Sequence, residues 1–230
     1  MRIMRGALFS SAATIAVLLF ALAFHAQAGT IGDPTETLGP GRFSLGVELD
    51  FTERDLEVEG TAGVREFESR RYMAKGAVGL MDGLDLFLKV GLADAENGGF
   101  NGDLGLGGGA GIRLNLFPRD VVTLGLLLQF LTFTSENSEE VEWREWDLAF
   151  GASYKGIKGF TPYGGLLISM VDGDLEERVG EQLVRRDLEE DETVGAFLGM
   201  SITLRDRIDI GLEARFFHES SISAFVNYRF

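Results

Sequence analysis

The sequence predicts an all-β fold: a closed, antiparallel, up-and-down transmembrane β-barrel of ten strands, with eight strands as the alternative. Three observations predict it. Residues 42–230 alternate apolar and polar side chains with a period of two, as pleated strands do. Short and long connections follow one another in strict turn. The chain also holds 31 glycines, only four prolines and no cysteine, which speaks against a helical bundle and excludes a disulfide framework.

The first 28 residues have the features of a cleaved signal peptide. Arg2 and Arg5 precede an apolar run from residue 12 to 24, and the small residues Ala26 and Ala28 follow it. The run is shorter than the ~20 residues that a spanning helix needs. We therefore expect residues 1–28 to be removed, residues 29–41 to form a periplasmic linker, and residues 42–230 to form the barrel.

Without Arg2 and Arg5, 19 basic residues face 36 acidic ones, a net charge of −17. A chain with this net charge does not neutralise the phosphate backbone of a nucleic acid, so nucleic acid is excluded as a partner.

Ten segments carry the alternation: residues 43–51, 71–80, 84–92, 103–116, 122–130, 145–154, 160–170, 194–204, 208–216 and 222–230. In the first, Phe43, Leu45 and Val47 share one face, and Glu48 and Asp50 lie on the other. The second and third set apolar rows against Arg71, Lys75, Asp85 and Lys89. Each segment thus has one apolar and one polar face.

The fourth segment has glycine at four polar-face positions, Gly105, Gly107, Gly109 and Gly111. We expect this row to leave interior space for water or for large neighbours such as Phe87, Leu127 or Tyr163. The fifth, sixth, eighth and ninth segments alternate regularly. The seventh is the least clear, because residues 162–165 (Pro-Tyr-Gly-Gly) interrupt its alternation.

The connections supply the strand count. Tight turns are expected at residues 81–83, 118–120, 156–159 and 205–207, and longer or more polar links at 52–66, 94–102, 134–142, 172–192 and 217–220. Outer-membrane barrels keep short turns on the periplasmic side and longer loops outside. Four turns and five loops between two periplasmic termini imply ten strands.

Charges in the middle of strands favour a membrane barrel over a soluble sandwich, because a barrel turns apolar faces to lipid and encloses the polar ones. The expected lumen charge network mixes both signs: Glu48, Asp50, Arg71, Lys75, Asp85, Lys89, Asp103, Arg113, Asp147, Asp209, Glu213 and Arg215. Enclosed charges are tolerated only when they are paired or wetted.

The last segment carries the family resemblance. Ile222, Ala224, Val226, Tyr228 and Phe230 share one face, and the segment ends on an aromatic ring. It resembles the C-terminal strand of bacterial outer-membrane β-barrels, and residues 42–230 as a whole resemble the OmpA-like and opacity-type superfamily. The resemblance implies an outer-membrane location, Tyr228 and Phe230 as a signal for the barrel-assembly machinery, and outer-membrane lipid and lipopolysaccharide as partners. We expect a monomer.

Within this reading we expect a structural or surface-interaction role, with a narrow ion channel as the alternative. Acidic loops, such as residues 172–192 with ten acidic and three basic side chains, are expected to stay solvated. Asp172 and Asp174 lack the further ligands of a calcium loop, so no metal site or cofactor is expected.

An enzyme is the outside possibility. The spacing of His218 and Ser220 is similar to that of outer-membrane lipid A deacylases, but none of the ten residues after Ser220 is acidic, and Glu219 would point to the opposite face of an extended strand. No Asp-x-His pair of an omptin-like protease occurs either. We therefore expect no enzyme activity.

Overall fold

The computed structural model describes residues 30–60, 64–98, 100–117, 120–137, 140–179, 182–190 and 193–230, and the expected signal peptide lies outside these ranges. The strands are β1 (Phe43–Val58), β2 (Val64–Met81), β3 (Leu84–Ala93), β4 (Glu96–Asn97), β5 (Phe100–Asn101), β6 (Gly105–Asn115), β7 (Val122–Glu136), β8 (Glu140–Tyr154), β9 (Phe160–Val179), β10 (Gln182–Glu190), β11 (Val194–Leu204), β12 (Ile208–Phe216) and β13 (Ser220–Arg229). Among the described residues, no helix is long and apolar enough to cross a membrane.

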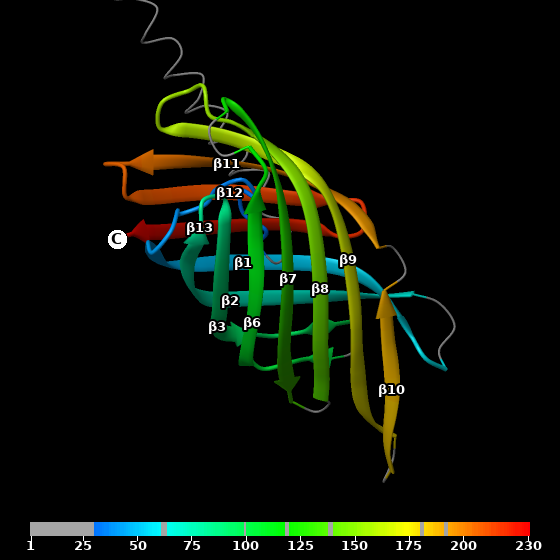
Figure 1. The fold of residues 1–230 in the computed structure, drawn as a ribbon. Coiled ribbons are helices and arrows are strands. Elements are labelled where there is room, and N and C mark those ends of the chain that lie inside the picture. The colour runs from blue at the N-terminus through cyan, green and yellow to red at the C-terminus, as the bar shows by residue number, and fades with distance from the viewer. Residues whose placement is uncertain are drawn as a thin grey trace, which may run out of the picture.

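Ten of these strands form a closed antiparallel ring, in the order β1-β2-β3-β6-β7-β8-β9-β11-β12-β13 and back to β1 (Figure 1). The last strand closes the ring on the first, with Val47 opposite Val226. The ten-stranded barrel predicted from the connections is confirmed. Pro162 does not interrupt β9, since the strand continues through it and pairs with Met200 of β11.

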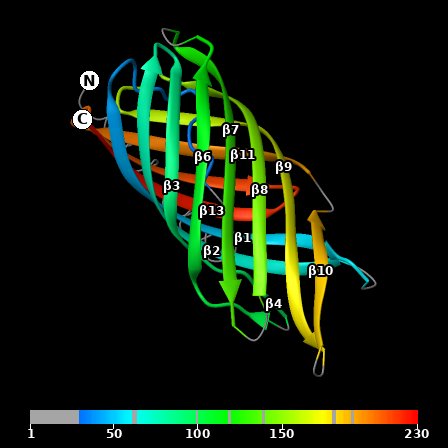
Figure 2. The ribbon, with the colours of Figure 1, turned by 60° about the horizontal axis from the view of Figure 1, so that its bottom comes forward.

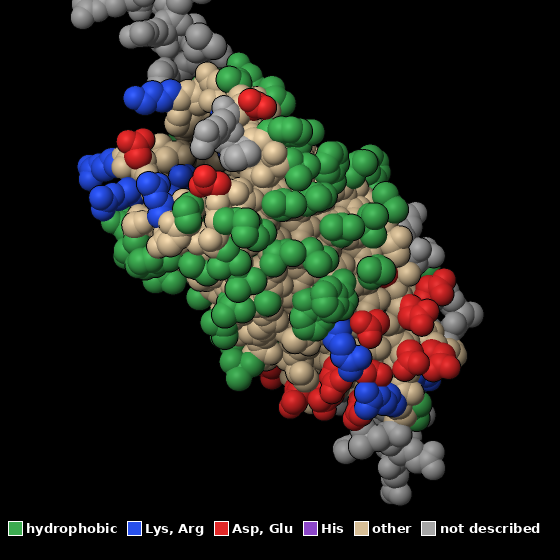
Figure 3. All heavy atoms as spheres, in the orientation of Figure 1, with side chains coloured by type: hydrophobic (Ala, Val, Ile, Leu, Met, Phe, Trp, Pro, Cys, Tyr) green, Lys and Arg blue, Asp and Glu red, His purple; other side chains and the backbone are tan. Residues whose placement is uncertain are grey.

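The two faces of the ring differ as the alternation predicts. Large apolar side chains of the ring strands are exposed, and Figure 3 shows them as a belt on one face of the barrel; Leu88 and Leu106 are 62% and 78% exposed. Charged side chains of the same strands, such as Glu48 and Arg71, are buried inside. This distribution suits a bilayer, where apolar surface meets lipid and the backbone polar groups are paired within a closed ladder.

The end of the barrel that holds the short turns is called the turn end, and the opposite end the loop end. At the turn end the β11–β12 connection is tight, with Arg205 and Asp206 both at positive φ (52° and 58°). Two consecutive left-handed residues are the geometry of a type I′ hairpin turn, whose twist matches that of the flanking strands.

Strands extend further at the loop end than the sequence pattern indicated. Most of the expected loops 52–66, 134–142 and 172–192 is strand, because β1, β2, β7, β8 and β9 continue through them and β10 follows. β10 pairs with both β9 and β1 and so closes a further part of the wall beyond β11–β13 (Figure 2). The acidic segments are therefore largely paired strands and not loops, although outward side chains such as Asp172 and Glu142 remain exposed to solvent.

A cluster of buried apolar side chains fills this extension, and we call it the apolar cap. Its members are Leu56, Val58, Phe67, Met73, Ala93, Ala95, Leu131, Phe133, Val141, Trp143, Val171, Leu175 and Leu188. Toward the loop end, the outward side chains of the same strands change from apolar to polar. In β1 the change comes between Phe51 and Glu53, and in β8 between Trp146 and Arg144. The extension thus has the faces of a water-soluble barrel, apolar within and polar without.

Glycines on the inner wall face aromatic rings that cross the lumen. A Cβ atom added at Gly111, Gly199 or Gly211 would lie 2.3 Å from Phe87 Cζ, 2.3 Å from Tyr163 Cζ and 2.2 Å from Phe225 Cζ, respectively. The expected space in the glycine row is thus filled, at Gly111 by Phe87. These rings belong to a second buried cluster, which also contains Ile31, Leu127, Ala149, Leu167 and Phe197.

The close approach at Gly199 predicts a loss of stability in the Gly199→Ala variant. The buried Tyr163 ring must move, which costs ~1–3 kcal/mol in a well-packed interior. Gly76→Ala is the matched control, because its Cβ would meet only Leu45 Cδ2 at 3.6 Å. Urea unfolding of the refolded barrel, followed by tryptophan fluorescence, measures both. Equal midpoints for the two variants would contradict this packing.

Candidate functional site

Among the described residues, the buried polar and charged side chains are concentrated in the lumen. From the turn end to the loop end it holds three layers: an inserted N-terminal segment, a layer of charged side chains, and the apolar cap. Each layer is built from strands far apart in sequence.

Residues 30–38 enter the lumen from the turn end, and we call them the lumen plug. Ile31 is fully buried, and Thr30, Asp33 and Thr35 are at most 2% exposed. The backbone N–H groups of Ile31 and Gly32 donate to Oε1 and Oε2 of Glu213, at 2.9 Å each. The structure therefore places this part of the expected linker inside the barrel.

Further side chains of the wall bind the plug backbone. Lys89 Nζ donates to the Thr30 carbonyl (2.9 Å), Arg113 Nη1 to that of Glu36 (2.7 Å) and Asn115 Nδ2 to that of Thr35 (2.5 Å). The Leu38 N–H donates to both carboxylate oxygens of Asp85 (3.1 and 3.0 Å). The inward charges at this level thus pair largely with a segment of the chain's own backbone.

The wall also has room for the plug only because two positions lack side chains. A Cβ at Gly125 would lie 2.3 Å from the Pro34 carbonyl oxygen, and one at Gly151 would lie 2.8 Å from Pro34 Cγ. The plug is thus matched to the lumen in shape as well as in hydrogen bonding.

Lysines and carboxylates pair in the layer around the plug. Glu48 accepts from Lys75 Nζ at 2.9 Å and lies 2.8 Å from Lys89 Nζ. Both ammonium groups also lie over the Phe87 ring, at 4.7 and 5.6 Å from its centroid. Arg229 lies nearer the turn end and pairs with Glu36 and Asp209.

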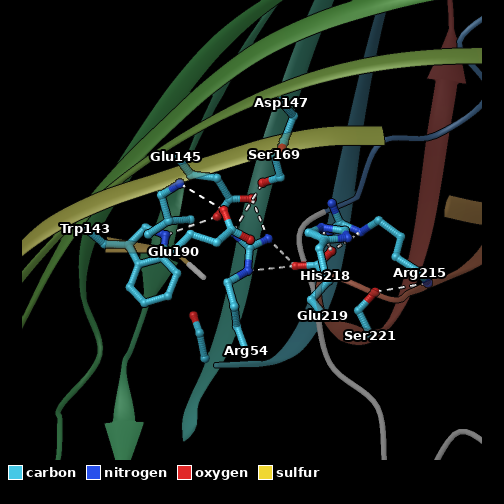
Figure 4. A network of polar contacts seen from close by, with 12 residues as sticks. Arg54, Trp143, Glu145, Asp147, Ser169, Glu190, Arg215, His218, Glu219 and Ser221 are labelled. Atoms are coloured by element: carbon cyan, nitrogen blue, oxygen red, sulfur yellow. Dashed lines mark hydrogen bonds and ion pairs between the residues drawn. The ribbon is translucent and has the colours of Figure 1, made fainter. Parts of the chain in front are cut away.

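The most connected group lies just beyond the lipid-facing belt, toward the loop end, and we call it the Arg54 cluster: Arg54, Glu145, Glu190 and Glu219 (Figure 4). The fully buried Arg54 guanidinium pairs with Glu219, with Glu190 (3.4 Å) and with Glu145 (3.7 Å). It also donates to Ser169 Oγ at 3.2 Å. One cation thus links strands β1, β8 and β10 to the β12–β13 connection.

Neighbouring groups complete the cluster. Glu145 pairs with Arg71 Nη2 (2.8 Å) and accepts from Trp143 Nε1 (3.0 Å), while Glu219 pairs with Arg215 Nε (3.0 Å). The Arg71 guanidinium lies over the Phe133 and Trp143 rings of the apolar cap. The charge layer and the cap are therefore in direct contact.

Burial raises the pKa of Glu190 to about 8; Arg54 opposes this effect, and the carboxylates of Glu145 and Glu219 add to it. Burial lowers the pKa of Arg54, but the carboxylates of Glu219, Glu145 and Glu190 together outweigh it, so that the pKa of Arg54 is raised above its usual value. Arg54 therefore stays charged, and Glu190 is the acidic member of the cluster that holds a proton most readily.

Eleven of the twelve residues expected in the lumen charge network are buried: Glu48, Asp50, Arg71, Lys75, Asp85, Lys89, Arg113, Asp147, Asp209, Glu213 and Arg215. Asp103 does not join them. It is exposed because it precedes β6, where the inward alternation has not yet begun.

None of the four members of the Arg54 cluster is among the twelve expected lumen charges. Arg54, Glu190 and Glu219 fall in expected loops, and Glu145 is the first residue of an expected strand. The sequence does contain a pattern that places Arg54 on the inner face of β1. After Phe51 the alternation continues, with Glu53, Asp55 and Glu57 outside and Arg54, Leu56 and Val58 inside. Only the polarity of the two faces reverses, as happens where a strand leaves the membrane.

The structure does not bring His218 and Ser220 together. His218 is buried with Nε2 3.2 Å from Glu219 Oε1, whereas Ser220 is exposed. The neighbouring Ser221 Oγ accepts from the Arg215 backbone N–H instead. No hydrogen bond joins His218 to either serine in the described part of the chain. Nor do three or more acidic or histidine side chains among the described residues form a group that could hold a metal ion.

No family model matches the chain, and no curated protein matches its sequence. Solved structures with a similar fold include the translocator domain of the autotransporter NalP from Neisseria meningitidis, with 12% identity and a TM-score of 0.46 over 96% of this chain and 98% of that one. Another is the outer membrane protease OmpT from Escherichia coli, with 11% identity and a TM-score of 0.48 over 85% and 100% of the two chains. A third is the toluene transporter TbuX from Ralstonia pickettii, with 11% identity and a TM-score of 0.33 over 90% and 95%. These are similarities of fold.

The two hydrogen bonds to Glu213 predict that Glu213→Gln loosens the lumen plug. An amide has a single acceptor oxygen, so one buried N–H of Ile31 or Gly32 loses its partner, at a cost of ~1–3 kcal/mol. Amide hydrogen exchange at residues 31 and 32 should become faster. Glu142→Gln, an exposed change at the loop end, should leave it unaltered. Unchanged exchange in the Glu213 variant would show that the plug is held by other contacts alone.

Burial predicts different outcomes for two arginines that each contact three carboxylates. Arg54→Met leaves buried carboxylates without their cation and should destabilise the barrel by ~3–5 kcal/mol. Arg144, which pairs with Glu142, Asp172 and Asp174, is 42% exposed, and Arg144→Met should change stability little. The stability of the two variants is compared by their midpoints of urea unfolding in lipid vesicles. Similar losses in both variants would contradict the electrostatic role given to Arg54.

Proposed function

We propose that this chain is an outer-membrane β-barrel with a closed, non-conducting lumen, and that it serves as a rigid anchor for an acidic projection with a surface-interaction role. The observation that carries the proposal is that three layers of buried side chains follow one another along the lumen: the plug, the Arg54 cluster and the apolar cap. The belt of exposed apolar side chains supports a membrane location.

The lumen contents argue against the narrow channel considered as the alternative. Ions passing through would have to displace a plug bound by Glu213, Lys89 and Arg113, and then an apolar cap without charges. An apolar constriction excludes hydrated ions. A conducting state would thus need both layers to move.

The projection at the loop end favours a role in display. Its outer face is acidic and ordered by cross-strand ion pairs, since Arg144 lies 3.2 Å from Asp172 and Arg185 lies 2.6 Å from Asp174. Acidic side chains gather at this end in Figure 3. We propose that it faces the outside of the cell and that both termini are periplasmic. The exposed Ser220 and buried His218 give no support to lipid A deacylation.

The proposal predicts no unitary conductance when the refolded protein is added to a planar bilayer. An open porin, refolded in the same way, provides the positive control. Stable conductance steps from this chain, at neutral pH and moderate voltage, would contradict the closed lumen.

The orientation predicts which inserted tags are accessible on intact cells. An epitope inserted between Val179 and Gln182, in the β9–β10 connection, should bind antibody without permeabilisation. The same epitope in the β8–β9 turn, after Ile157, should bind only after the outer membrane is opened. The reverse pattern would overturn the proposed orientation.

A further inference from the structure

A pocket of about 360 Å³ opens at the turn end, beside the outer end of the lumen plug. The end of the plug, the β11–β12 turn and the end of β13 line it, with Leu38, Arg42, Asp206, Arg207, Arg229 and Phe230 among the lining residues. Pockets that hold small molecules start at ~300 Å³, so this one suits a headgroup-sized ligand. Basic side chains gather at the same end of the molecule in Figure 3.

The pocket offers charges of both signs that the chain leaves available. Arg229 is held in place by Glu36 and Asp209. Arg42 and Asp206 form no ion pair with any other described residue, and Arg207 Nη1 has only a long hydrogen bond to Tyr228 Oη, at 3.4 Å. Two guanidinium groups and one carboxylate therefore remain for a ligand that is itself both anionic and cationic.

The pocket adjoins the lipid-facing belt. Phe230, in its wall, stacks on Phe43 with ring centroids 4.5 Å apart. Leu45 and Val226, further along the same pair of strands, are 56% and 41% exposed. A molecule with its polar group in the pocket can therefore lay a hydrocarbon chain against β1 and β13.

We propose that this pocket binds the headgroup of a phospholipid that carries a phosphate and a primary ammonium, as in phosphatidylethanolamine. Arg42 and Arg207 bind the phosphate, for which guanidinium groups are well suited, and Asp206 accepts from the ammonium. The proposal rests on the barrel lying in a bilayer, but not on a closed lumen or on any role of the loop end.

Lipid competition tests the pocket. The full-length barrel is refolded in mixed micelles with equal amounts of phosphatidylethanolamine, phosphatidylcholine and phosphatidylglycerol, and retained lipid is measured by native mass spectrometry. The wild type should retain phosphatidylethanolamine over the other two. The double variant R42Q/R207Q should retain it about tenfold less, as expected for loss of charge-assisted hydrogen bonds.

Asp206→Asn should reduce the preference for phosphatidylethanolamine over phosphatidylcholine, because a neutral amide oxygen accepts a weaker hydrogen bond from the ammonium than a carboxylate does. The quaternary ammonium of phosphatidylcholine has no N–H to donate. Arg205→Gln is the matched control, because Arg205 lies in the same turn but does not line the pocket. It should behave as the wild type. Heat-modifiable migration on gels shows that each variant has folded, so a failed barrel is distinguished from a failed pocket.

Three results would overturn the proposal: equal retention of all three lipids by the wild type, preference for phosphatidylglycerol, or unchanged retention in folded R42Q/R207Q. A preference for phosphatidylglycerol would identify a general anion site.

Discussion

Enclosed charge is the constraint on which the rest of this structure depends. A ring of strands that turns its apolar face to lipid must turn its polar face inward, and at ten strands side chains largely fill the space within. Unpaired charges there would cost several kcal/mol each. Most of these charges are paired with one another, as in the Arg54 cluster, or bind the chain's own backbone, as in the lumen plug. The glycines that face Pro34 and Phe87 follow from the same need, since paired and packed groups require room.

The same strands change their environment partway along. Up to Phe51, β1 carries apolar residues outside and polar ones inside; beyond it, Glu53 lies outside and Leu56 is buried inside. The membrane barrel therefore continues into a water-soluble one without a break in the ladder. The Arg54 cluster lies at the junction, where the inward face changes from charged to apolar, and Arg71 contacts both sides. A projection built in this way is continuous with its anchor, as the proposed role in display requires.

The sequence predicted those features that a repeat among neighbouring residues encodes. Period-two alternation found the ten strands of the ring, and eleven of the twelve expected lumen charges are buried. The pattern failed where the polarity of the faces reversed, so that paired strands at the loop end were taken for loops. It also failed for residues 30–38, whose pattern has no period and whose partners are remote: Ile31 and Glu213 are 182 positions apart.

By itself, the sequence determined the ring, its strand count and the direction in which most side chains point, because a strand's alternation is a property of consecutive residues. Only the tertiary structure decided what the inward charges bind. Glu213 and Lys89 receive a returning segment of the chain, and Arg54 joins carboxylates from three other parts of the chain. His218 meets Glu219 while Ser220 lies exposed. These outcomes depend on ring closure, shear and filling of a shared interior, which no local pattern encodes.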